Sequence, residues 1–149
     1  MYRCMITLLA VVSFLPWSVS AQVNPSAVAG TWDMVHDDWP GTLVIYTPDQ
    51  LNCSQGGACT YCSWSIDGQY TSVFGHTHAV RGTFQGRDSN RRTSELCKAS
   101  DHRIRFTIAF DSHAPQPFEG YIFTSSQRTM AGYTWWQGIP FGWLAEKRR

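Results

Sequence analysis

The chain has 149 residues, of which 43% are hydrophobic, 14% aromatic and 15% charged, and its formal net charge is +1. This composition excludes an intrinsically disordered chain, and the length suits one domain with one modest core. Neither half contains the combined basic and aromatic motifs of a nucleic-acid module, so we expect no nucleic-acid partner.

The N-terminus has the pattern of a secretory signal peptide over residues 1–21. Arg3 gives a positive start, residues 5–15 form an apolar stretch, and residues 19–21 are small enough for signal peptidase. The apolar stretch is shorter than the roughly 20 residues that span a bilayer, and no later segment is long enough either. We therefore expect residues 22–149 to form a single exported domain without a membrane anchor, either periplasmic or secreted.

The rest of the sequence predicts short strands separated by turns, because no window keeps a helical period for three turns. We expect little helix. The third and fourth predicted strands can also be joined as one bent strand around Asp67-Gly68, which gives eight strands in total. The predicted strands cover residues 28–35, 42–47, 60–66, 69–74, 78–85, 103–110, 118–124, 129–136 and 141–147.

Alternation is clearest over residues 103–110, where even positions are large and apolar and odd positions are small or polar. One face of this strand is therefore buried, as in an antiparallel sheet. Strands joined by short turns form a meander, and a meander of eight strands protects its edges best as a closed up-and-down barrel. Longer connections are predicted at 48–58 and 86–101. Tight connections are predicted at residues 39–41, 67–68, 113–115 and 137–140.

The small net charge conceals an asymmetry between the two halves. Residues 22–80 contain five acids and no Lys or Arg, whereas residues 81–149 contain eleven basic residues and six acids. We favour an arrangement in which the halves meet as neighbouring strands and neutralise each other. The alternative is a basic end that binds an anionic partner. That end would consist of Arg87, Arg91, Arg92, Lys98, Arg103 and Arg105.

Four cysteines remain after removal of the leader, namely Cys53, Cys59, Cys62 and Cys97. In an exported chain this even number predicts two disulfides, with three connectivities among which the sequence does not choose. A zinc site formed by the same four residues is the lesser alternative. The spacing of Cys59 and Cys62 also occurs in redox motifs, but those begin a helix in an α/β fold, which this sequence does not predict.

A second metal candidate is the pair His76 and His78, which lie on one face of an extended segment. This spacing can bind zinc or copper when a third ligand is near. The surrounding residues are typical of a turn, however, which favours two solvent-exposed histidines. We therefore predict no metal and no cofactor.

Several segments resemble the avidin and lipocalin group of small calycin-type barrels. Gly30-Thr31-Trp32 is similar to the Gly-x-Trp opening of these families, and residues 68–75 and 82–86 resemble the third and fourth strands of avidin and streptavidin. The resemblance implies an all-β, eight-stranded barrel that binds a small molecule. Later segments follow in the order of the fifth to eighth strands of avidins, at residues 105–110, 118–121, 134–136 and 142–145.

The same resemblance implies a binding site. Tyr70 and Ser72 would donate hydrogen bonds to a carbonyl oxygen of the ligand. Residues 33–36 depart from the polar contacts of the family, so biotin is not the expected ligand. Aromatic walls are implied at Phe106, Trp135, Trp136 and Trp143.

Two of these aromatic residues are adjacent, and strand alternation points them to opposite faces. Only one of Trp135 and Trp136 can therefore line the interior. Trp32 is expected to close one end of the barrel against a cationic side chain of the last strand, Lys147 or Arg148. Residues 36–38 are interpreted as the solvated end of a hairpin.

The sequence supports three functional hypotheses. The leading one is an exported, disulfide-bonded barrel that binds a small hydrophobic or amphipathic ligand in an aromatic-lined mouth, as a monomer or an oligomer. The second is a secreted interaction module, an enzyme inhibitor or a glycan-binding protein, that uses Trp39, Trp64 and the 86–101 loop on its outside. The third and weakest is a barrel enzyme such as a cyclase. No catalytic motif is recognisable, so we do not predict an enzyme.

Overall fold

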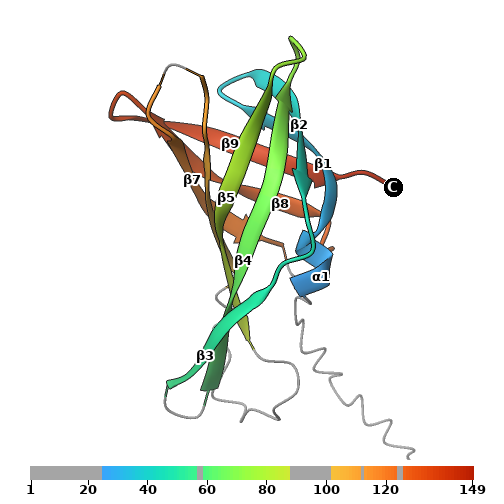
Figure 1. Cartoon of the computed structure of the whole chain (residues 1–149), viewed down its shortest axis with the longest axis vertical. Helices are drawn as coiled ribbons and strands as arrows, with labels where there is room; N and C mark the ends of the chain where they lie inside the picture. The colour runs from blue at the N-terminus through green and yellow to red at the C-terminus, as the bar shows by residue number, and fades with distance from the viewer. Residues whose placement is uncertain (1–24, 57–58, 88–101, 112, 124–125) are drawn as a thin grey trace, which may run out of the picture.

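The computed structural model describes residues 25–56, 59–87, 102–111, 113–123 and 126–149 (Figure 1). The predicted leader over residues 1–21 lies outside this range. The described ranges also leave out four residues of the predicted 86–101 connection, namely Arg91, Arg92, Cys97 and Lys98.

The described part of the chain contains nine strands and one short helix. The four-residue helix is its only helical segment, as the sequence predicts. In chain order the elements are α1 (Pro25–Val28), β1 (Gly30–His36), β2 (Trp39–Ile45), β3 (Gln50–Gly56), β4 (Cys59–Ser72), β5 (Thr77–Arg87), β6 (Arg103–Ile108), β7 (Gln116–Ile122), β8 (Thr129–Trp136) and β9 (Ile139–Lys147).

Eight of the strands form a closed antiparallel barrel, which confirms the predicted fold class. Each strand from β4 to β9 pairs with the next one in the sequence, and β9 pairs with β1. The barrel closes where β2 pairs with the last part of β4, with Leu43 opposite Tyr70. The third and fourth predicted strands are indeed one continuous strand, β4, and Asp67-Gly68 lies inside it rather than at a connection.

The strand β3 was not predicted, because residues 48–58 were expected to form a loop. The 14 residues of β4 extend beyond the part that pairs with β2, and β3 covers this otherwise free edge. Figure 1 shows β3 projecting from the lower end of the barrel together with the start of β4. A disulfide joins Cys53 of β3 to Cys62 of β4.

This bridge confirms one of the two predicted disulfides. It also rules out the four-cysteine zinc site, because two of the four thiols are consumed. Cys59 and Cys97 lie outside the residues whose side chains are described, so a second bridge stays a prediction.

The first hairpin turns earlier than predicted. Residues 39–41 belong to β2, and the turn is formed by Asp37 and Asp38, whose φ angles are 48° and 61°. A two-residue hairpin of this kind needs positive φ at both positions, and Asp tolerates that conformation. The predicted connection at 137–140 is shorter as well, since Gln137 and Gly138 alone form the turn between β8 and β9.

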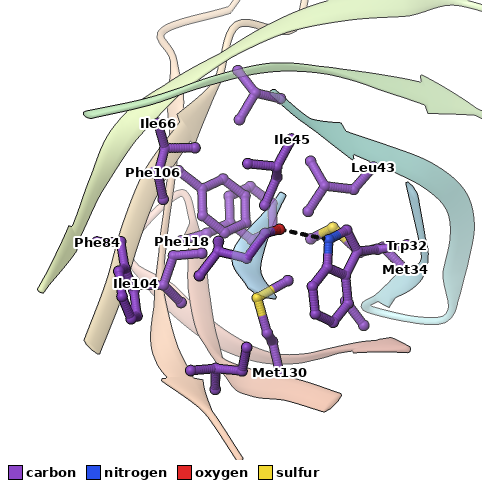
Figure 2. Packing of buried hydrophobic residues seen from close by; sticks show 14 of the residues in the cluster. Trp32, Met34, Leu43, Ile45, Ile66, Phe84, Ile104, Phe106, Phe118 and Met130 are labelled. Atoms are coloured by element: carbon purple, nitrogen blue, oxygen red, sulfur yellow. Dashed lines mark hydrogen bonds between the residues drawn. The ribbon is translucent and has the colours of Figure 1, made fainter. Parts of the chain in front are cut away.

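The interior is packed with apolar side chains from alternate positions of the strands. Figure 2 shows this core, with Trp32 beside Met34 and Leu43 and with the parallel rings of Phe106 and Phe118 near the centre. Trp64, which was expected on the outside, is also buried and packs against Phe84. The alternation predicted over β6 is confirmed, since its residues at 104, 106 and 108 are all buried.

Trp32 closes one end of the barrel, as predicted. Its indole N–H donates a hydrogen bond of 3.0 Å to the carbonyl oxygen of Val28, marked by the dashed line in Figure 2. The ammonium of Lys147 lies 5.4 Å from the centre of the Trp32 ring and donates to the carbonyl oxygen of Ala27. The predicted cationic partner is therefore Lys147. Burial, and secondarily the positive charge of Arg128, lowers the pKa of this lysine.

Two of the ion pairs on the outer face connect the two halves of the chain. Arg148 pairs with Asp33, with 2.6 Å between the guanidinium nitrogen and the carboxylate oxygen. Arg81 lies 3.9 Å from Asp67. Arg103 and Arg105 of the predicted basic end both contact the carboxylate of Glu119. Glu119 belongs to the same half of the chain as Arg103 and Arg105, so only the pairs of Arg148 and Arg81 agree with mutual neutralisation of the halves. Exposed pairs such as these two add only about 0–1 kcal/mol each.

Replacing Trp32 by Ala should lower the free energy of unfolding by about 3–5 kcal/mol, because a fully buried indole and its hydrogen bond are lost. Trp39→Ala is the matched control, since Trp39 is 52% exposed, and should cost about 1 kcal/mol or less. Urea denaturation of both variants measures the difference. Equal losses would contradict the role of Trp32 as the closure of the barrel.

Candidate functional site

The end of the barrel opposite Trp32 is open and contains a pocket of about 300 Å³. β1 runs from Trp32 at the closed end to His36 at the mouth, so the same inward face of one strand contributes to both ends. The pocket is lined by His36, Asp37, Trp39, Phe110, His113, Gln116, Trp136 and Phe141.

His36 forms the floor of this pocket. Its Nε2 atom lies 3.2 Å from the hydroxyl oxygen of Tyr70, and a hydrogen bond joins the two side chains. The ring of His36 also meets the edge of Phe118, with 5.4 Å between the ring centres. His36 is therefore buried, at 9% exposure, and is not part of a solvated hairpin end as the sequence suggested. The adjacent Asp37 is exposed, as expected.

Tyr70 fits against His36 because Gly41 has no side chain. A Cβ atom at position 41 would lie 2.3 Å from the hydroxyl oxygen of Tyr70, which is far inside van der Waals contact. Gly41 is opposite Ser72 in the closing pair of strands, so the tyrosine ring two residues earlier crosses over it. The glycine is thus required for the floor of the pocket.

Burial keeps both side chains of the floor, His36 and Tyr70, in their neutral forms. Desolvation lowers the pKa of His36 below its usual value of 6.5, and the nearby charge of Asp37 opposes this only in part. Desolvation also raises the pKa of Tyr70 above 10.0. At neutral pH the hydrogen bond therefore joins a neutral imidazole and a neutral phenol.

A second hydrogen-bonded group fixes the wall formed by β7 and β8. The Gln116 amide nitrogen donates to the Thr134 hydroxyl at 2.8 Å, and this hydroxyl donates to the carbonyl oxygen of Pro117 at 2.6 Å. Both side chains are buried. The bonds hold the amide of Gln116 in one orientation at the pocket wall.

The other walls of the pocket are aromatic. Trp136 meets His113 edge-on, with 4.9 Å between ring centres, and Trp39 packs against Phe74 at 5.7 Å. The ring of Phe110 packs edge-to-face with that of His78, with 4.8 Å between the ring centres. Two indoles and two phenyl rings, counting Phe141, therefore surround the mouth.

Below the mouth the barrel is filled. Phe106 stacks on Phe118 with 5.0 Å between ring centres and an angle of 1° between planes, and Trp143 meets Phe106 edge-on at 5.5 Å. The indole N–H of Trp143 donates to the carbonyl oxygen of Glu119. The pocket is therefore a shallow mouth above a packed core.

The predicted binding residues occupy four different places. Trp136 lines the pocket, whereas Trp135 lies on the outer face and packs against Tyr133, so the prediction that only one of the two tryptophans points inward is confirmed. Ser72 accepts a hydrogen bond from the backbone N–H of His76 in the β4–β5 turn and does not line the pocket. Tyr70, Phe106 and Trp143 are buried beneath the mouth.

The two candidate metal ligands are separated in environment. His76 is exposed in a turn, and His78 is buried between the rings of Tyr70 and Phe110. Within the described ranges, no three His, Cys, Asp or Glu side chains are grouped as a metal site would require.

Of the residues that line the pocket, only Trp136 was predicted from the sequence to bind a ligand. The available signal was strand alternation continued to the strand ends, because His36 has the parity of Trp32 and Phe141 has that of Trp143. Gln116 likewise has the parity of the buried Phe118.

Comparisons with protein-family models, with curated proteins and with solved structures gave no significant match. The resemblance to avidins and lipocalins therefore stays a prediction. The described residues also include no helix long and apolar enough to cross a membrane.

Acidification should destabilise the fold through His36. Because the folded-state pKa of His36 lies below 6.5, the unfolded chain binds the proton first, and the free energy of unfolding falls as the pH drops below about 6.5. The fall ends only below the folded-state pKa.

We expect His36→Gln to show a smaller loss of stability than the natural chain between pH 7.5 and pH 5.5. Urea denaturation of both proteins at both pH values isolates this contribution, because all other titratable side chains are common to the two proteins. Identical losses would contradict a neutral buried His36.

Proposed function

We propose that the protein binds a small hydrophobic or amphipathic molecule in the pocket at the open end of its barrel. The observation that carries this proposal is the mouth pocket of about 300 Å³, which has four aromatic side chains around a few fixed polar groups. Ligand sites in proteins are typically concave, mostly apolar and supplied with a small number of oriented polar atoms.

The dimensions of the site favour a small ligand. Its volume is at the lower end of the range of about 300–1,000 Å³ that is common for ligand pockets. Trp32 closes the opposite end, and the rings of Phe106 and Phe118 fill the space between. A ligand would therefore enter and leave through the mouth alone.

The apolar and the polar side chains of the pocket would have different roles in binding. Trp136 and Phe141 offer faces that would bury the apolar body of the ligand. His36 and Gln116, each held by a hydrogen bond, offer polar atoms that would fix its orientation. We propose binding without catalysis.

We further propose that the protein works in an oxidising compartment, secreted or periplasmic. The disulfide between Cys53 and Cys62 supports this, because such bonds persist mainly outside the cytosol. The leader pattern over residues 1–21 points the same way.

A second candidate function, docking of a protein or glycan over the mouth, is favoured by apolar side chains on the rim. Trp39 and Phe74 are 52% and 70% exposed and contact each other. Val73 and Ile139, at 58% and 57%, are exposed at the same end. Native mass spectrometry of protein from its own host separates the candidates, since a small-molecule adduct supports the first and a protein adduct the second.

Binding of N-phenyl-1-naphthylamine, an uncharged aromatic probe, tests the mouth pocket. Trp136→Ala should weaken binding at least about tenfold, because the variant removes one wall. Trp135→Ala is the matched control, since the neighbouring indole lies on the outer face, and should bind as the natural chain does. Probe fluorescence gives both affinities. No saturable binding, or equal weakening by the two variants, would contradict the proposed site.

A further inference from the structure

The turns at the open end of the barrel are acidic. Their described residues are 37–38, 73–76, 109–111, 113–115 and 137–138, which connect the strands at the mouth. These segments contain Asp37, Asp38 and Asp111 but no Lys or Arg.

Basic side chains gather at the other end. Arg128, Lys147, Arg148 and Arg149 line a surface hollow beside the end that Trp32 closes, and they outnumber the two acids of the same hollow, Asp33 and Glu146. The charge asymmetry of the sequence is thus in part an asymmetry along the barrel axis. Such a field draws cations towards the mouth and anions away from it.

Asp37 brings one of these carboxylates to the pocket itself. It lines the pocket and is solvent-exposed. Asp33, by contrast, is paired with Arg148. None of the ion pairs between described side chains includes Asp37, so its charge is available to a ligand.

The aromatic walls add attraction of the same sign. Trp39, Phe110, Trp136 and Phe141 line the pocket together with Asp37. An aromatic face is electrostatically negative, and indole attracts cations most strongly. Aromatic boxes of this composition bind quaternary ammonium groups, which cannot donate hydrogen bonds and need none from the protein.

The histidine at the floor of the pocket does not oppose a cation at neutral or higher pH. Burial lowers the pKa of His36, so this side chain is uncharged at the floor. His113 stands at the rim, with its ring against the edge of Trp136.

From this combination we propose that the mouth pocket selects a small organic cation of the quaternary or tertiary ammonium class. The charged head lies among the aromatic rings, beside the carboxylate of Asp37. The inference rests on the proposed function, and it names the chemical class of the ligand.

The test compares choline with 3,3-dimethyl-1-butanol, which has the same shape but no charge. Both are titrated at pH 8 against protein loaded with N-phenyl-1-naphthylamine, and displacement of the probe gives the two affinities. We expect choline to bind at least about tenfold more tightly than the alcohol.

Asp37→Asn should reduce this preference at least about threefold, because it removes one unit of charge from the pocket. Asn adopts the positive φ of this position, so the turn is kept. Asp38→Asn is the control, since its side chain does not line the pocket, and should leave the preference unchanged.

The outcomes separate the two proposals. Equal displacement by choline and the alcohol, or an unchanged preference in Asp37→Asn, overturns the cation inference while probe binding still supports the pocket. Failure of the probe itself to bind overturns the proposed function, and the inference with it.

Discussion

The pairing of β2 with the last part of β4 closes the barrel, and the functional end of the molecule depends on it. This register places Tyr70 over Gly41, where only glycine leaves room for the ring. The phenol then reaches His36, 34 residues away in the sequence, and their hydrogen bond forms the floor of the mouth. Loss of this pairing would open the barrel and remove the floor of the pocket at the same time.

The barrel could be predicted because its determinants are local. Alternation along β8 predicted its bounds correctly, at residues 129–136, and short turns implied a meander. The strand β3 could not be predicted, since its residues are polar and it forms only because β4 leaves an edge free. Trp39-Pro40-Gly41 is a stronger local turn signal than Asp37-Asp38, yet the inward parity of β1 and the pairing of His36 with Trp39 place the turn at the aspartates.

The candidate site was predictable only in part. Parity alone predicted that one of Trp135 and Trp136 faces inward, and the inward one lines the pocket. The bond between His36 and Tyr70 joins strands that are distant in the sequence, so no local pattern could reveal it. His36 beside two aspartates looks like a solvated turn until the barrel is closed around it. Burial then makes the same residue a neutral part of the floor.

The two ends of the barrel differ in what they can do. Trp32 and Lys147 seal one end, whereas the other is a shallow aromatic mouth with acidic turns. The most direct test of this assignment is an NMR titration of ¹⁵N-labelled protein with choline, observed at the indole N–H signals. The account predicts that the signals of Trp39 and Trp136 shift together while those of Trp32 and Trp135 stay in place. Shifts confined to Trp135 on the outer face, or no shift at any indole, would contradict a ligand site in the mouth.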